Sequence, residues 1–267
     1  MAIFLLSRGS YSWGSQIAGM VAKKLGYACI SREDILKTSG QFDLPEIKLI
    51  KAFNEMPSLI DRFIGSRKEE YLSYLRAAIL KNVRQDNVVA HGFAGLFLIH
   101  NISHVIKVRI TIDQKDRIAL AQKEGGMGAG DAFRALKKID AQRQKWGQYM
   151  FGVDLSDSSN YHMTFHVNRQ TINDAVELVC YAAGLNRYRT TIESQKSLDD
   201  QLLASEVRVA LLKMRPDAVV NSDSGRIYVE ARENGMDTDE IKQLISKTAL
   251  EVIGVKQVEV NIKPSSA

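Results

Sequence analysis

The chain begins with an apolar run that leads, through a loop containing glycine, into a helical pattern. The run Ala2–Leu6 is typical of a buried strand, and Gly9 and Gly14 follow it with four residues between them. This spacing is typical of a loop that binds phosphate groups, which needs a Lys after the second Gly and then a hydroxyl residue. Ser15 and Gln16 stand in those two places. The motif is therefore incomplete.

The whole loop is a candidate site for nucleotide phosphates. Its hydroxyl groups lie near the start of a predicted helix, where backbone N–H groups favour an anion. Two alternatives stay open: Ser15 only caps the helix, and Trp13 either stacks on a base or covers an empty pocket. The candidate nucleotide-binding residues are Ser7, Arg8, Gly9, Ser10, Tyr11, Ser12, Trp13, Gly14, Ser15 and Gln16.

Short apolar runs alternate with helical patterns through residues 1–188. Strands are predicted at 87–92, 104–112 and 161–167, and helices between them. This alternation predicts an α/β fold with a mostly parallel sheet and flanking helices. The stretch Gly125–Gly130 holds four glycines in six residues and predicts a loop or hinge before a basic helix.

A second, smaller domain is predicted at 189–267. The stretch 186–196 is polar and short of core residues, and we interpret it as a linker. A helix, two strands, a helix and a strand follow, which predicts a small α+β domain. Residues 193–267 carry a net charge of −3, whereas the rest of the chain carries +8. A basic first domain suits a polyanionic partner such as a nucleotide.

Composition limits the cellular setting. Hydrophobic residues make up 45% of the chain, but no apolar run approaches the ~20 residues that cross a bilayer. The N-terminal residues lack the pattern of a signal peptide. Cys29 and Cys180 are far apart and unclustered, which is typical of a reducing compartment. The sequence therefore predicts a cytoplasmic protein without a transmembrane segment.

Three stretches of the first domain carry a family resemblance. They are "LSRGSYSWGSQIAGMVAKKLG" at 6–26, "DRI" at 116–118 and "KKIDAQRQKWGQYMFGVDLSDSSNY" at 137–161. With them, residues 1–185 resemble the cytidylate-kinase-like family of P-loop proteins. The last seventy or so residues resemble a BON domain through "VRVALL", "SGRIYVEA" and "IGVKQVEVNI".

The resemblance implies a P-loop nucleoside-monophosphate-kinase-like fold. It also implies an enzyme that uses ATP and Mg²⁺ to phosphorylate a nucleoside monophosphate such as CMP. The basic helix then corresponds to the lid, whose Arg143, with Arg134 or Lys138, contacts the transferred phosphoryl group. Asp140, three residues before Arg143, is placed to orient it. The alternative is that this helix is a solvated basic surface.

Departures from the family pattern favour a second hypothesis. Tyr11 and Trp13 are bulky where glycines let the backbone close on phosphates, Phe93 replaces an Arg that holds the substrate phosphate, and His162 replaces an Asp. The alternative is an inactive kinase-fold module that couples nucleotide binding to a BON-domain interaction. The sequence leaves the activity, the acceptor, the BON ligand and a homo-oligomeric state open.

Metal and nucleic-acid sites are weakly supported. Asp34, Asp113 and Asp116 are the carboxylates closest to the pattern of a Mg²⁺ ligand, and nothing in the sequence chooses among them. The histidines form no cluster with other ligand residues, so no structural metal is predicted. The chain has no motif rich in stacking aromatic residues, which argues against RNA as a partner.

Overall fold

The computed structural model describes residues 2–9, 13–39, 68–92, 95–168, 171–233, 235 and 237–264. The predicted site residues Ser10, Tyr11 and Ser12, and the departure at Phe93, lie outside the described residues. The side chain of Arg8 lies outside them as well. Among the described residues, no helix is long and apolar enough to cross a membrane.

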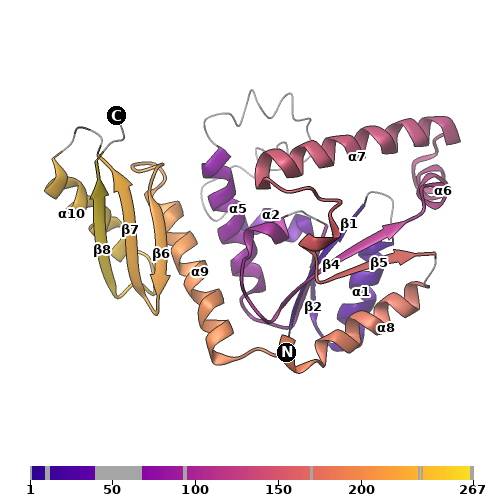
Figure 1. Ribbon diagram of the computed structural model, residues 1–267, viewed down its shortest axis with the longest axis horizontal. Helices are drawn as coiled ribbons and strands as arrows, with labels where there is room; N and C mark the ends of the chain where they lie inside the picture. Colours follow the sequence, from indigo (N-terminus) through magenta and orange to yellow (C-terminus); the bar gives the residue numbers. More distant parts are fainter. Residues whose placement is uncertain are drawn as a thin grey trace.

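A five-stranded parallel sheet forms the centre of the first domain (Figure 1). Its strand order is β2-β3-β1-β4-β5, which confirms the predicted parallel α/β fold. The first strand is an almost fully buried apolar run, because helices cover both of its faces. The strands are β1 (Ile3–Arg8), β2 (Ala28–Ile30), β3 (Val88–His91), β4 (Val105–Ile112) and β5 (Met163–Val167).

Two hydrophobic cores lie on the two faces of this sheet. Helices α1 (Gly14–Leu25) and α8 (Ile172–Ala183) cover one face. Helix α5 (Lys68–Val83) and the 3-10 turn η3 (Gly95–Leu98) cover the other. Helix α2 (Arg32–Ser39) contributes a buried isoleucine to the second core.

The strand β4 is apolar along the whole of one face, whereas its other face is apolar only at Val105. Val108 and Ile110 enter the core beneath α1 and α8. Side chains alternate along a strand, so Lys107 and Arg109 point to the opposite face. There the Lys107 ammonium lies 5.8 Å from the centre of the Phe97 ring, which belongs to the second core.

The predicted loop at 125–130 is shorter than expected. Helix α6 (Gln114–Gly125) continues into it, and α7 (Ala129–Phe151) begins before its end. Gly126 has a left-handed φ of 64° and ends α6, a conformation that glycine adopts without strain. Only residues 126–128 connect the two helices, and α7 then runs across the sheet (Figure 1).

A small second sheet lies apart from the first (Figure 1). Strands β6 (Val219–Asp223) and β7 (Arg226–Arg232) form an antiparallel hairpin, and β8 (Gln257–Lys263) pairs with β7 in parallel. Helix α10 (Thr238–Leu250) precedes β8 and packs into the same core. Helix, strand, strand, helix and strand therefore follow one another in the predicted order.

Helix α9 (Ile192–Leu211) joins the two parts of the molecule. It begins inside the stretch expected to be a linker, directly after the short turn η5 (Asn186–Tyr188). Another short turn, η4 (Ser158–Asn160), lies earlier in the chain, between α7 and β5. Leu198 and Leu202 pack in the core beneath α5, whereas Val207 and Leu211 pack in the core of the small sheet. One continuous helix thus contributes to both cores.

A buried histidine fixes the start of this helix to the first domain. The His104 side chain is 0% exposed, and its Nδ1 lies 2.7 Å from Ser194 Oγ. Ser194 also closes the capping box of α9 with Thr191. Burial lowers the pKa of His104, since the charged imidazolium loses its hydration.

Acidification from pH 7 to pH 5 is expected to lower the free energy of unfolding, and His104→Asn to reduce that loss. The unfolded chain takes up the His104 proton near pH 6.5, whereas the folded chain takes it up only at lower pH. The free energy of unfolding is therefore unaffected by His104 above about pH 6.5. Below this pH it falls by at most about 1.4 kcal/mol per pH unit. Urea unfolding of both proteins across this range measures the slopes, and equal slopes would contradict the assignment.

Candidate active site

A cavity of about 330 Å³ lies at the carboxyl ends of β1 and β4, and residues of α7 line it as well. In open parallel sheets, ligands bind in the crevice at this edge. The polar side chains that line it come from β1, β4, α6, α7 and the segment after α7. They are Ser7, Arg109, Thr111, Arg117, Asp140, Arg143, Gln144 and Ser156, and Gly9 joins them through its backbone.

The loop before α1 supplies the floor of this cavity. Ser7 follows the buried part of β1. Gly9 faces Arg117, and a Cβ atom added at Gly9 would lie 3.8 Å from the Arg117 guanidinium. Trp13 is the residue that caps α1, without a side-chain hydrogen bond, so the alternative in which Ser15 only caps this helix does not hold. Trp13 packs against the core beneath α1 and α8, and Gly14 is buried.

Ser15 and Gln16, where a complete motif has its Lys and hydroxyl residue, are exposed in the first turn of α1. Neither side chain lines the cavity. The charge that a phosphate group needs must therefore come from other elements.

Three arginines of the described part of the chain line the cavity, each from a different element. Arg109 comes from β4, Arg117 from α6 and Arg143 from α7. Among the described residues of the lining, Asp140 is the one carboxylate, so these residues carry a surplus of positive charge. Such a surplus favours an anionic ligand.

Asp140 binds Arg117 through two parallel hydrogen bonds of 2.6 and 2.8 Å. The Arg117 side chain is only 14% exposed, and this bidentate geometry fixes the plane of its guanidinium. Sequence analysis expected Asp140 to orient Arg143. The structure instead shows both carboxylate oxygens on Arg117, where they tie α6 to α7.

Tyr161 lies beside Arg109 but is not part of the cavity lining. The Arg109 guanidinium lies 5.5 Å from the centre of the Tyr161 ring, and the Tyr161 hydroxyl donates a hydrogen bond of 2.9 Å to the carbonyl of Leu155. Burial raises the pKa of Tyr161, although a hydrogen bond with Ser7 and the charges of Arg109 and Arg143 act in the opposite direction. The hydroxyl therefore stays protonated at neutral pH.

The segment after α7 closes the cavity. Ser156 donates to the Asp154 carboxylate through its backbone N–H, at 2.6 Å, and through its hydroxyl. These hydrogen bonds, with one from Gln144, lower the pKa of Asp154 to about 2. Leu155 lies directly against Gly147 of α7, where any Cβ would overlap its side chain.

Gly147→Ala is expected to lower the free energy of unfolding by about 1–3 kcal/mol, because Leu155 must leave its place. Gly130→Ala is the matched control on the same helix, since a Cβ there meets only Arg134, at an ordinary 3.6 Å. Urea unfolding compares the two variants. Equal stability of both would show that the contact between Gly147 and Leu155 is not tightly packed.

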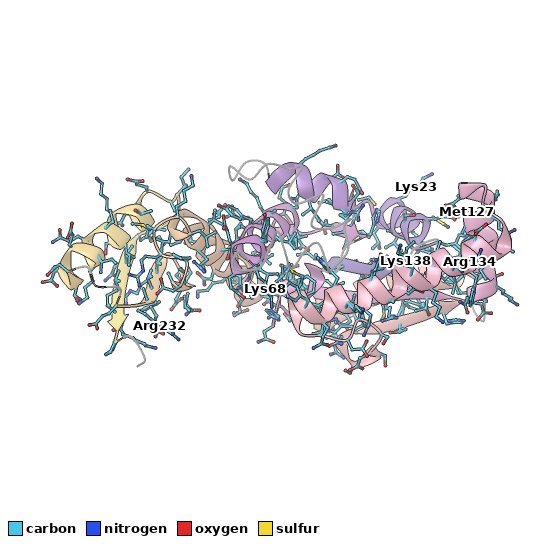
Figure 2. The ribbon with its side chains drawn as sticks, turned by 90° about the horizontal axis from the view of Figure 1, so that it is seen from above. Lys23, Lys68, Met127, Arg134, Lys138 and Arg232 are labelled. Carbon is cyan, nitrogen blue, oxygen red and sulfur yellow. The ribbon has the colours of Figure 1, made fainter. Side chains whose placement is uncertain are left out.

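Other predicted residues lie elsewhere. Arg134 is 73% exposed and pairs with Asp131 at 2.7 Å, and Lys138 is exposed. Figure 2 shows both on the N-terminal half of α7, and neither lines the cavity. Of the candidate lid residues, the structure brings together Asp140 and Arg143 only.

The three candidate Mg²⁺ ligands have local partners. Asp34 accepts hydrogen bonds of 3.0 and 2.7 Å from Ser31. Asp113 lies 3.0 Å from His166 Nε2, and Asp116 accepts from Asn168. None of the three lines the cavity, and the described part of the chain holds no group of three or more His, Cys, Asp or Glu suited to a metal.

Two of the three arginines, Arg109 and Arg117, are not among the site residues predicted from the sequence. Arg117 belongs to the "DRI" stretch, which carries part of the family resemblance. Arg109 lies within an apolar strand, where the alternation of β4 marks it as the side chain opposite the apolar face. That alternation was the available signal.

Comparisons with known proteins agree with this architecture. The family model of the cytidylate kinase-like family matches residues 4–169. No curated protein matches the chain. The structure is similar to that of an uncharacterized protein from Eubacterium ventriosum ATCC 27560, with a TM-score of 0.54 and 16% identity over 68% of this chain and 97% of that chain.

Two kinases are more distantly similar. Shikimate kinase from Bacteroides thetaiotaomicron has a TM-score of 0.39 and 11% identity, over 69% of this chain and 99% of that chain. Dephospho-CoA kinase from Campylobacter jejuni has a TM-score of 0.36 and 12% identity, over 68% and 96%. At such identities a structural likeness concerns the fold and not the substrate.

Proposed function

Because this chain belongs to the cytidylate kinase-like family, we propose that it transfers the γ-phosphoryl group of ATP to a nucleoside monophosphate such as CMP. The observation that supports this most is the cluster of Arg109, Arg117 and Arg143 around one cavity at the edge of the sheet. Phosphoryl transfer depends mainly on positioning and on positive charge around the transferred group.

The three arginines divide this task by their positions. Arg117 is held rigidly by Asp140 above Gly9, so it presents a fixed charge to phosphates on the loop. Arg143 comes from α7, the helix that also carries Asp140, and lines the same cavity. Preorganised charges of this kind stabilise the charge that develops on the phosphoryl oxygens in the transition state. Arg134 and Lys138 are further lid candidates if α7 moves towards the loop.

The described residues of the cavity do not form a protein-built Mg²⁺ site. Asp140, the one carboxylate among them, has both oxygens on Arg117. A Mg²⁺ ion that arrives with ATP is held mainly by nucleotide oxygens and water. The hydroxyl groups of Ser7 and Thr111 are the remaining uncharged oxygen donors on β1 and β4.

The direct test is phosphoryl transfer from radiolabelled ATP to a panel of nucleoside monophosphates. Labelled diphosphate from one or more members is expected, together with a higher melting temperature in the presence of ATP, since a ligand of the folded state stabilises it. The proposal would be refuted if the protein showed no transfer to any acceptor and no stabilisation by any nucleotide.

The alternative is a kinase-fold module that binds a nucleotide without turnover and responds through its second domain. The absence of a Lys at Ser15 favours it, and α9 offers a physical link between the two parts. Stabilisation by ATP without transfer to any acceptor would support this alternative. The likeness of 189–267 to a BON domain stays a prediction, supported by its order of helices and strands.

Ser15→Lys is expected to strengthen ATP binding by about 10–100-fold. A lysine here adds one charge-assisted hydrogen bond to the β- and γ-phosphates, worth about 1.5–3 kcal/mol. Gln16→Lys is the matched control, because it adds the same charge to the same exposed turn. Calorimetric titration measures both affinities. Nanomolar affinity of the wild type, or equal gains in both variants, would contradict this interpretation of the loop.

A further inference from the structure

A second cavity, of about 490 Å³, lies further down β4 on the same face as Arg109. It is formed by the segment 99–103, the start of β4 and the segment 159–162. Its polar side chains include His100, Asn101, Ser103, Lys107, Asn160 and His162.

Tyr161 separates this cavity from the candidate active site. Its ring lines the second cavity, while its hydroxyl bonds to the carbonyl of Leu155, a residue that lines the first. Lys107 and Arg109 are two residues apart on β4, so each supplies a cation from the same face to its own cavity. The two sites are therefore neighbours with different linings.

Among the described residues that line the second cavity, none balances the charge of Lys107. No carboxylate is among the described residues that line it. The Lys107 ammonium lies over the Phe97 ring, and no ion pair or hydrogen bond from it to another described residue exists. Burial lowers the pKa of Lys107, because its ammonium loses part of its hydration.

The two histidines add hydrogen-bond donors. His162 Nδ1 accepts a bond of 2.8 Å from the backbone N–H of Lys107, so the proton of the neutral ring is on Nε2. Burial lowers the pKa of His100 and of His162, and Lys107 lowers both further. Arg76 of α5 adds to this effect at His100, and Arg187 of η5 at His162. Each charged group that acts on these imidazoles is a cation.

We propose that this cavity is a second binding site, for a small phosphate-bearing molecule. Lys107 supplies the charge, His162 supplies an N–H donor from Nε2, and the side chains of Asn101 and Ser103 offer further donors to a tetrahedral anion. A bound dianion also gives the cations around the two histidines the counter-charge that the described lining lacks.

Inorganic phosphate is the probe, and the histidine ring signals in NMR spectra of the full chain are the readout. The signals of His100 and His162 are expected to move saturably, with a rise in the pKa of both, because an anion favours the imidazolium form. His166 bonds to Thr111, which lines the first cavity, so its signal reports phosphate there instead. In Arg143→Ala the shifts of His100 and His162 should persist.

Lys107→Met is expected to weaken phosphate binding, read on His100 and His162, by about tenfold or more. Lys247→Met is the matched control, since it removes one exposed charge from α10. If Lys107→Met does not fold, His162→Asp answers the same question, because it places a carboxylate beside Lys107. The proposal is overturned by the absence of saturable shifts in the wild type, or by unchanged binding in the folded variants. None of these results depends on whether ATP is turned over.

Discussion

Arg143→Ala is expected to lower the rate of phosphoryl transfer by about 10²-fold or more while the fold and most of the ATP binding stay intact. The Arg143 side chain comes from α7 and lines the same cavity as Ser7 and Gly9. A cation that meets charge developing in the transition state contributes more to kcat than to ground-state binding. The fold should tolerate the change, because the pair of Asp140 and Arg117 still ties α7 to α6.

Arg134→Ala is the matched control for this experiment. It removes the same group from the same helix, but Arg134 is exposed and pairs with Asp131 outside the cavity. Steady-state kinetics of both variants should show a large fall in kcat for Arg143→Ala and a small one for Arg134→Ala. Equal activity of Arg143→Ala and wild type would refute the assignment, and an equal fall in both variants would show that α7 moves over the loop.

The sheet was predictable because its signal is local. Buried parallel strands are continuous apolar runs, and those at Ile3–Arg8 and Val88–His91 follow this rule, whereas Val105–Ile112 is β-branched but alternates with polar residues. The glycine-rich stretch was less predictable. Glycine lowers helix stability only by about 1 kcal/mol per residue, and packing of Ala132 and Leu136 of α7 against Ala121 of α6 outweighs that cost.

The site was predictable only in part, because it depends on contacts between distant elements. Arg143 and Asp140 could be placed by their resemblance to a lid. Their spacing of three residues indicated a contact along one helix, but Asp140 instead meets Arg117, which lies 23 residues before it. Spacing within a helix shows which side chains can meet, and the packing of α6 on α7 decides which do.

The stretch expected to be a linker shows the same limit. Residues 186–196 are polar, and polarity is typical of both linkers and exposed first turns of helices. The capping box of Thr191 and Ser194 was the available signal for a helix that starts at Ile192. The packing of Leu198 beneath α5 could not be predicted from local sequence, because the partner helix lies more than a hundred residues earlier.

Leu198→Ala is expected to lower the free energy of unfolding by about 2–5 kcal/mol, which is the range for a large-to-small change in a packed core. Its side chain is 0% exposed and lies in the core of the first domain, although the sequence places it in the second. Ion pairing of Arg84 with Asp199 at 2.8 Å and a hydrogen bond from Gln201 to the carbonyl of His100 at 2.7 Å hold the same part of α9. Loss of Leu198 therefore weakens the attachment of α9 to the first domain.

Comparison with Leu211→Ala decides whether the two parts unfold together. Leu211 is equally buried, 13 residues further along α9, but in the core of the small sheet. If α9 transmits stability, calorimetry should show one transition that both variants move to lower temperature. Two transitions, with Leu198→Ala affecting only the one that belongs to residues 189–267, would mean that the helix belongs to the second domain alone. Because α9 packs against both cores, we expect a single transition. Such coupling would let ligand binding at the arginine cavity change the stability of the small sheet.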